Sequence, residues 1–290
     1  MKLSLRKQQI IWGYIFVSPW IVGTLLLFAW PLVRSLLLSF QRVTGLVELK
    51  SEWAGLTNYS EAFREDVRLI PTLTETLTDL ALDLPLILIF SLIMAILLAR
   101  VRRGQTTLRA IFFMPVVIGS AGVIQELLRA GAGDEVMMST MEPILVSAES
   151  SPLEGGIVTP IQATLDRLTL IIWRTGVQIL LFVAGLNSIP PSLYEAAYVD
   201  GSTDWEAFWK ITLPMLSPVI LVAAIYTLVD SFTDPLNKVV DYIMDVSIGA
   251  SLRLDYGAAL GWIYFLLVFV LIVLLVRLSS GLVFYAGERT

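Results

Sequence analysis

The chain has 290 residues, of which 56% are hydrophobic and only 16% are charged. A soluble domain carries about a quarter charged residues, because its surface must face water. Here the apolar residues are gathered in long runs, which is typical of a membrane protein. The net charge of −5 is spread over the polar links and forms no basic stripe, which argues against a nucleic-acid partner.

The sequence contains neither cysteine nor histidine. This excludes thiol nucleophiles, disulfides, thiolate or imidazole metal ligands and histidine general bases from this chain. It also lacks a G-x-x-x-x-G-K-[ST] phosphate loop. We therefore expect no metal site and no bound cofactor in this chain, and any catalysis would have to use carboxylates, hydroxyls, lysine or arginine.

Six apolar stretches follow one another, each able to supply the roughly 20 helical residues that cross a ~30 Å hydrocarbon layer. They cover about 10–40, 73–99, 108–128, 168–189, 211–232 and 256–285. The first follows a basic start, as a secretory signal does, but it exceeds the usual apolar run of about 7–15 residues and no small-residue cleavage site follows it. We expect it to be retained. The sequence thus predicts an all-α membrane protein with one transmembrane domain over 1–290.

Basic residues near the span ends predict the orientation, because short cytoplasmic loops are enriched in lysine and arginine. They precede the first span and crowd the link between the second and third spans: Lys2, Arg6, Lys7, Arg100, Arg102, Arg103 and Arg109. Six spans then place both termini in the cytoplasm. The links at 41–70, 129–166 and 235–255 are expected outside, and the link at 190–210 is expected inside.

The inside link predicts a helix, a glycine turn and a second helix. Pro190 and Pro191 end the fourth span and suit the start of a short helix. Gly201 suits the C-terminal cap of that helix, and Thr203 and Glu206 have capping-box spacing for the next one. From these residues alone, the pair could equally rest in the lipid interface without a partner.

The same segment, residues 190–214, resembles a motif of a transporter family. Glu195-Ala196-Ala197, three residues, Gly201, nine residues, Ile211, one residue and Leu213-Pro214 are similar to the complete EAA loop of binding-protein-dependent ABC importer permeases. Shorter stretches resemble the maltose-type, or carbohydrate, branch of that family in the expected order: Gly55–Tyr59, Arg109–Pro115, Trp173-Arg174, Leu186–Pro190 and Tyr256–Ala259.

The resemblance implies the type I importer permease fold, in which the cytoplasmic helix–turn–helix is the coupling loop. It implies that an ATPase groove receives Glu195, Ala196, Ala197, Asp200 and Gly201. The implied partners are two ABC ATPase subunits, which bind ATP and Mg, a second similar permease, and an extracellular or periplasmic solute-binding protein. The implied function is import of a sugar or oligosaccharide through a bacterial or archaeal plasma membrane, by a chain that is not itself an enzyme.

Two outside loops depart from the family pattern. The loop after the third span lacks the usual aromatic-rich stretch and Gly-Asn turn, and Phe232 to Asn237 replace the usual Gly-Gly-Pro turn after the fifth. Both loops would face the delivering protein. The departures therefore leave open whether the solute is a sugar, a glycerol phosphate or another polar molecule.

Polar residues in the outer parts of the spans are candidates for the solute path. A charge at the centre of a membrane helix costs about 2.5–3.5 kcal/mol on insertion scales, so such residues usually face protein or water. Residues four apart share a helix face, which gives three pairs: Asp79 with Asp83, Arg174 with Gln178, and Asp230 with Asp234. Three more residues are predicted to lie at a similar depth in the membrane: Gln125, Trp173 and Tyr226. This set suits a hydroxyl-rich sugar. The alternatives are an Arg174–Asp pair that only locks helices together, or residues near the membrane interface that are hydrated among the lipid headgroups.

Two other functions are compatible with the residues. A stand-alone secondary transporter or channel would work without partners, and an intramembrane enzyme would use Asp79, Asp83 or Asp230. The sequence shows no Asp/Glu/His relay at mid-membrane that would indicate a proton-driven carrier. It does not distinguish a homodimeric pore from a heterodimeric one.

Overall fold

The computed structural model describes residues 5–45, 50–100, 171, 174–234, 237–249 and 252–281. Within these residues the chain is helical apart from one two-stranded hairpin. The predicted third span and the link at 129–166 lie outside them. The chain divides into two compact units, Met1–Thr76 with Leu236–Phe269, and Leu77–Pro235 with Val270–Thr290.

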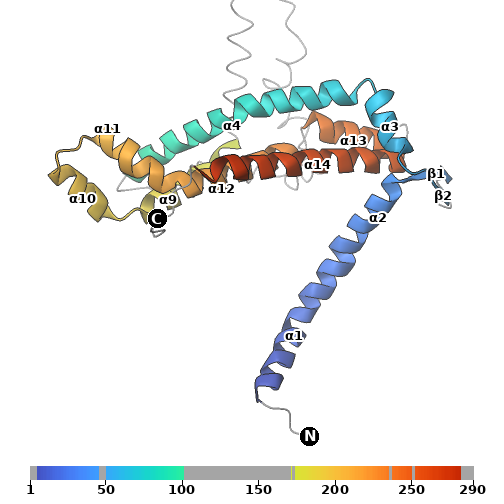
Figure 1. Ribbon diagram of the computed structural model, residues 1–290, viewed down its shortest axis with the longest axis horizontal. Helices are drawn as coiled ribbons and strands as arrows, with labels where there is room; N and C mark the ends of the chain where they lie inside the picture. Colours follow the sequence, from blue (N-terminus) through green and yellow to red (C-terminus); the bar gives the residue numbers. More distant parts are fainter. Residues whose placement is uncertain are drawn as a thin grey trace, which may run out of the picture. The chain divides into compact units, whose positions relative to one another are not determined.

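The first unit begins with a long helix, drawn in blue in Figure 1. It consists of α1 (Leu5–Thr24), a π-helical turn η1 (Leu25–Ala29) and α2 (Trp30–Ser39). None of its apolar span window is buried, and large side chains such as Phe16 and Leu27 are about four-fifths exposed, at 80% and 82%. A helix that is apolar on all sides is stable in contact with lipid or with another apolar protein surface.

A hairpin and a short helix follow this long helix. The hairpin pairs β1 (Gln41–Gly45) with β2 (Lys50–Trp53), and α3 (Thr57–Arg64) comes after a turn at Gly55. Asn58 on α3 is fully buried, and its amide group donates to the carbonyl oxygens of Ser39 and Gln41 at 3.0 and 2.9 Å. One side chain therefore fixes the end of α2 to the start of the hairpin.

Ion pairs and tyrosine contacts hold the elements of the first unit together. They join α3 and the residues after it to α13 (Lys238–Ile248) and to the start of α14 (Leu254–Ser279). Glu61 pairs through both carboxylate oxygens with the Arg253 guanidinium, which also lies 4.5 Å above the Tyr256 ring. The sequence did not predict α13, which lies in the expected outside link at 235–255.

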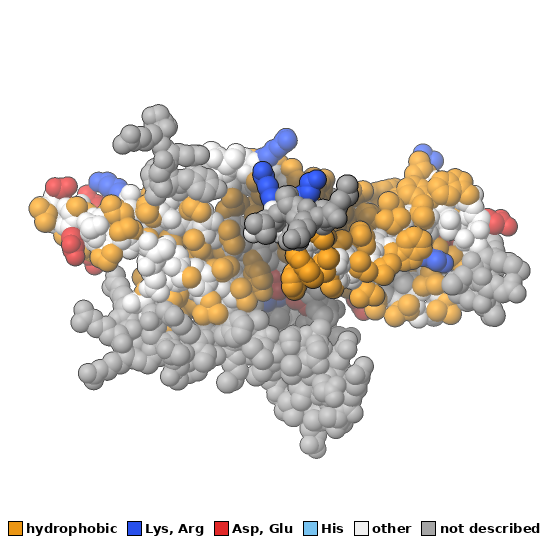
Figure 2. Space-filling view, turned by 90° about the horizontal axis from the view of Figure 1, so that it is seen from below, with side chains coloured by type: hydrophobic (Ala, Val, Ile, Leu, Met, Phe, Trp, Pro, Cys, Tyr) orange, Lys and Arg blue, Asp and Glu red, His pale blue; other side chains and the backbone are white. Residues whose placement is uncertain are grey.

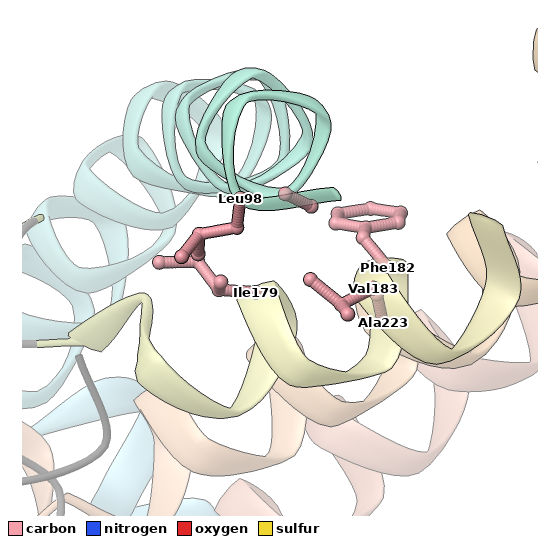
Figure 3. Close-up of a cluster of buried hydrophobic side chains, with 6 residues drawn as sticks. Leu98, Ile179, Phe182, Val183 and Ala223 are labelled. Atoms are coloured by element: carbon pink, nitrogen blue, oxygen red, sulfur yellow. The ribbon is translucent and has the colours of Figure 1, made fainter. Parts of the chain in front are cut away.

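The second unit packs three helices around a small apolar core. They are α4 (Leu69–Arg100), which begins in the first unit, α9 (Gly176–Ser188) and α12 (Leu213–Thr233). Figure 3 shows the core side chains from the three helices pointing at one another: Ala95, Leu98, Ile179, Phe182, Val183 and Ala223. Gly185 lets α9 approach α12, since a Cβ there would lie 2.8 Å from Leu216 and 2.9 Å from Val219.

The described residues contain four helical stretches long and apolar enough to cross a membrane, or up to five if a bent pair is one span. The four are Ile11–Ser39, Leu69–Ala99, a run within Asp204–Ile248, and Leu254–Ser279; the bent pair is Gly176–Ser188 with Pro191–Val199. They fall on the first, second, fourth, fifth and sixth predicted stretches. Because 108–128 is not described, six spans remain a prediction. Figure 2 shows hydrophobic side chains over much of the described surface in that view.

Candidate functional site

The first part of the site is a pair of short helices after α9. The chain bends by 62° into α10 (Pro191–Val199), and α11 (Asp204–Ala207) continues through the π-helical turn η2 (Phe208–Thr212) into α12. Gly201 between the helices has a φ of +85°, a left-handed conformation that side-chain-bearing residues rarely adopt. The backbone N–H of Ser202 donates to the carbonyl oxygen of Ala197 at 2.9 Å, which caps α10.

A reciprocal hydrogen bond begins α11. The Glu206 carboxylate accepts the backbone N–H of Thr203 at 3.0 Å, and the Thr203 hydroxyl accepts the N–H of Glu206 at 3.4 Å. This is the capping box that the Thr203–Glu206 spacing predicts. The glycine cap and the capping box together fix where α10 ends and where α11 starts.

The outer side of this helix pair is open to solvent. Glu195, Ala196, Asp200 and Gly201 are exposed and Ala197 is partly exposed; we call these five residues the coupling face. Large apolar side chains next to it are also exposed, with Val199 at 88% and Trp205 at 68%. In Figure 2 acidic side chains gather at the end of the ribbon where Figure 1 labels α10 and α11. Exposed apolar residues rimmed by polar ones mark a surface that contacts a protein or a membrane.

The second part of the site lies at the opposite end of α9. Arg174, just before α9, forms an ion pair with Asp234 at the end of α12, and their side chains are 24% and 19% exposed. One turn further along, the buried Gln178 donates its amide N–H to the Thr227 hydroxyl at 2.9 Å. The Gln178 amide oxygen accepts no hydrogen bond within the described part of the chain. A polar strip therefore runs between α9 and α12.

The other predicted path residues have different positions. Tyr226 and Asp230 are partly buried and precede Asp234 on α12 at four-residue spacing, so the three share one helix face. Asp79 and Asp83 lie one turn apart on α4, the first exposed and the second partly exposed. Gln125 and Trp173 lie outside the described residues.

Sequence reasoning missed Thr227, although a hydroxyl in an otherwise apolar run of α12 was a usable signal. Among the residues that the structure describes, no group of three or more acidic side chains could hold a metal ion. The polar strip thus offers hydrogen bonds and charges.

These features define an α-helical membrane protein with an exposed helix–glycine turn–helix at one end of α9 and a polar strip at the other. Residues 67–286 match the family described as "Binding-protein-dependent transport system inner membrane component". The chain belongs to this family and is a permease of an ABC importer. It is therefore a transport subunit and not an enzyme.

Curated relatives match along most of their length. The Bacillus subtilis protein described as "Probable ABC transporter permease protein YesP" is 29% identical over 99% of this chain and 96% of its own length. The arabinooligosaccharides permease AraP of Bacillus subtilis is 26% identical over 95% and 90%. The sn-glycerol-3-phosphate permease UgpA of Agrobacterium fabrum is 30% identical over 76% and 74%.

A solved structure shares the fold. In the bacterial ABC transporter that imports the acidic polysaccharide alginate, one chain superposes with a TM-score of 0.66 at 19% identity, covering 94% of this chain and 96% of that one. A second structure of a bacterial alginate ABC transporter contains an alginate-bound periplasmic protein and gives a TM-score of 0.65 at 18% identity.

Proposed function

We propose that this chain is one pore-forming half of an ATP-driven importer for a sugar or oligosaccharide, which an external solute-binding protein delivers. Support comes from the arabinooligosaccharide relative and from the fold shared with the alginate importer. The glycerol phosphate relative is the one observation that favours a second candidate, a permease for a glycerol phosphate or another polar solute.

The proposed architecture is a single permease domain over 1–290 with six spans and both termini in the cytoplasm of a bacterium or archaeon. The helix–turn–helix at 190–214 is then the cytoplasmic coupling loop. The hairpin, α3 and α13 lie on the outer side, where the binding protein arrives. A second, similar permease completes the pore.

The observation that carries this proposal is the Gly201 turn with the coupling face exposed beside it. Two ABC ATPase subunits bind ATP and Mg, and a groove in one of them receives Glu195, Ala196, Ala197, Asp200 and Gly201. The small alanine side chains allow close approach, and the Glu195 carboxylate pairs with a cationic group in the groove. Such a pair contributes mainly to register and specificity. Closure of the ATPases pushes on this loop and moves the spans between inward- and outward-facing states.

The proposed solute path is lined by Asp79, Asp83, Gln125, Trp173, Arg174, Gln178, Tyr226 and Asp230. Its support is the polar strip between α9 and α12, in which the Gln178 amide oxygen is buried without a hydrogen-bond partner among the described residues. Carboxylates, an amide and a guanidinium supply both acceptors and donors, which a sugar with many hydroxyl groups requires.

The test of the coupling role is the variant Glu195→Lys in the complete importer. Glu195 is exposed, so the change leaves folding and membrane insertion intact. The new lysine places a positive charge next to the cationic group of the ATPase groove, and the two charges repel each other. We expect insertion at the normal level, loss of ATPase co-purification and loss of uptake. Glu65→Lys, at an exposed glutamate on the outer side, is the control and should keep normal insertion and ATPase co-purification. Normal uptake by Glu195→Lys would refute the coupling role.

A further inference from the structure

A pocket of about 250 Å³ lies behind the coupling loop. Its walls come from α10, α11 and η2 on one side and from the ends of α4 and α9 on the other, all within the second unit. Successive residues of an α-helix are turned by about 100°, so Tyr194 and Tyr198 share one face of α10 while Glu195 and Val199 share another. The tyrosines line the pocket, and the coupling face points elsewhere.

The pocket wall combines aromatic rings with one acidic group. Tyr194, Tyr198 and Phe208 line it together with the Asp204 carboxylate and the Asn187 amide. The Tyr198 hydroxyl donates to Asp204 at 2.9 Å, and the Tyr194 and Thr212 hydroxyls share a hydrogen bond of 2.9 Å. These bonds hold the two rings in place.

We propose that this pocket binds a small organic cation, a quaternary ammonium ion, from the cytoplasm. Aromatic faces attract such cations within about 6 Å of the ring centroid, and the attraction grows when the cation leaves water. The Asp204 carboxylate in the pocket wall supplies the counter-charge. The volume is below the usual range of about 300–1,000 Å³ for drug-sized ligands, so the occupant is a single small ion.

A bound cation has a mechanical consequence, which rests on the proposed function. It touches α10 and α11 on one side and the ends of α4 and α9 on the other, so it holds the coupling loop against the spans. The cation thus lowers transport by stiffening the connection that must move during the cycle. Binding itself requires no ATPase and can be tested on the purified full chain.

Because the chain has no cysteine, one introduced thiol reports on the pocket. Ala99→Cys places it in the pocket wall, and Ala196→Cys places a matched thiol on the coupling face. The thiols are modified with a trimethylammonioethyl methanethiosulfonate probe and followed by intact mass, with choline or D-glucose as competitor at equal ionic strength. We expect choline to slow modification of Ala99→Cys by about tenfold and to leave Ala196→Cys unchanged.

Asp204→Asn in the Ala99→Cys background removes the counter-charge while keeping size. Loss of this charge–charge attraction should weaken binding by about tenfold, so choline protection should fall from about tenfold to about twofold at the same concentration. Tyr198→Phe keeps the ring and should retain most of the protection. The proposal is overturned if choline gives no protection, if D-glucose protects equally, or if both thiols are slowed alike.

The regulatory step has its own readout in the assembled importer. Choline should reduce solute-stimulated ATP hydrolysis in the unmodified assembly and not in Asp204→Asn. Binding without this reduction would refute the stiffening role. Failure of the Glu195→Lys prediction would instead remove the coupling function and leave the thiol-protection result unaffected, so the two failures are distinguishable.

Discussion

Arg174 supplies the positive charge of the polar strip, and its role depends on which carboxylate it pairs with. It pairs with Asp234 while Asp230 lies one turn away on the same face of α12. Removing one partner of a partly buried ion pair leaves the other charge without compensation, which destabilises more than losing both. A guanidinium has five N–H donors, more than one ion pair uses, and we propose that the others contact a solute hydroxyl.

The double variant Arg174→Asp with Asp234→Arg tests whether this ion pair only holds the helices together or whether Arg174 also contacts the solute. The pair is restored with its direction reversed, so we expect normal expression and thermal stability. Uptake should fall by about tenfold or more, because a charge-assisted hydrogen bond to solute, worth about 1.5–3 kcal/mol, is misplaced. Thermal unfolding and uptake are measured on the same preparations. Full uptake by the swapped chain would assign the pair to helix locking alone.

At the scale of elements, Asp66 joins three parts of the first unit. Its carboxylate accepts the Tyr242 and Tyr256 hydroxyls at 2.6 and 2.5 Å and the backbone N–H groups of Arg68 and Leu69 at 2.8 and 3.1 Å. Burial raises the pKa of Asp66, but the four hydrogen bonds outweigh it and hold the pKa below its usual 3.8. Glu61 behaves similarly, since its hydrogen bond from Arg253 lowers its pKa against the effect of burial.

A depressed carboxylate pKa sets the sign of the pH dependence. The stabilisation by Asp66 is present above the unfolded-state value near 3.8 and is lost as the pH falls through the lower folded-state value. Asp66→Asn should loosen this region by about 1 kcal/mol after solvent screening, already at neutral pH. We expect roughly fivefold faster hydrogen exchange at the Arg68 and Leu69 amides. Glu65→Gln, one residue earlier and exposed, should leave exchange unchanged, and equal rates in both variants would contradict the anchoring role.

At the scale of the whole molecule, the main feature is a surface rich in exposed apolar side chains. Large hydrophobic side chains are exposed along the N-terminal helix and on α4, α12 and α14. Contact between these side chains and water would be unfavourable. Lipid and a second permease are the environments that would cover them. In the proposed importer, the orientation of the chain in the membrane decides which loops would meet the ATPases and which would meet the binding protein.

Single thiols test that orientation, because the natural chain has none. Ser51→Cys lies on the hairpin and Ser192→Cys on α10, and both positions are exposed. A membrane-impermeant maleimide should modify Ser51→Cys in right-side-out vesicles and Ser192→Cys only in inverted ones. The opposite pattern would place α10 and α11 outside and exclude contact with cytoplasmic ATPases.

Local patterns were readable without coordinates. The apolar stretches, the Pro190-Pro191 boundary, the glycine cap at Gly201 and the Thr203–Glu206 capping box each depend on residues within about one or two helical turns. A short apolar or polar pattern specifies such features directly, and the structure shows them at the predicted places, except for the stretch at 108–128, which lies outside the described residues. The EAA-type spacing in the same segment led to the correct family.

Only the tertiary structure decided which distant residues meet. Arg174 had several carboxylates within reach by depth, and its pairing with Asp234, 60 residues away, follows from the packing of α9 on α12. Asn58 was noted only as part of the stretch Gly55–Tyr59 and Asp66 was not singled out, yet each joins separate elements. Helix periodicity fixes the face of a side chain but not the neighbour opposite it, because close packing of whole helices sets that register. The pocket behind α10 likewise exists only once α4 and α9 end beside it.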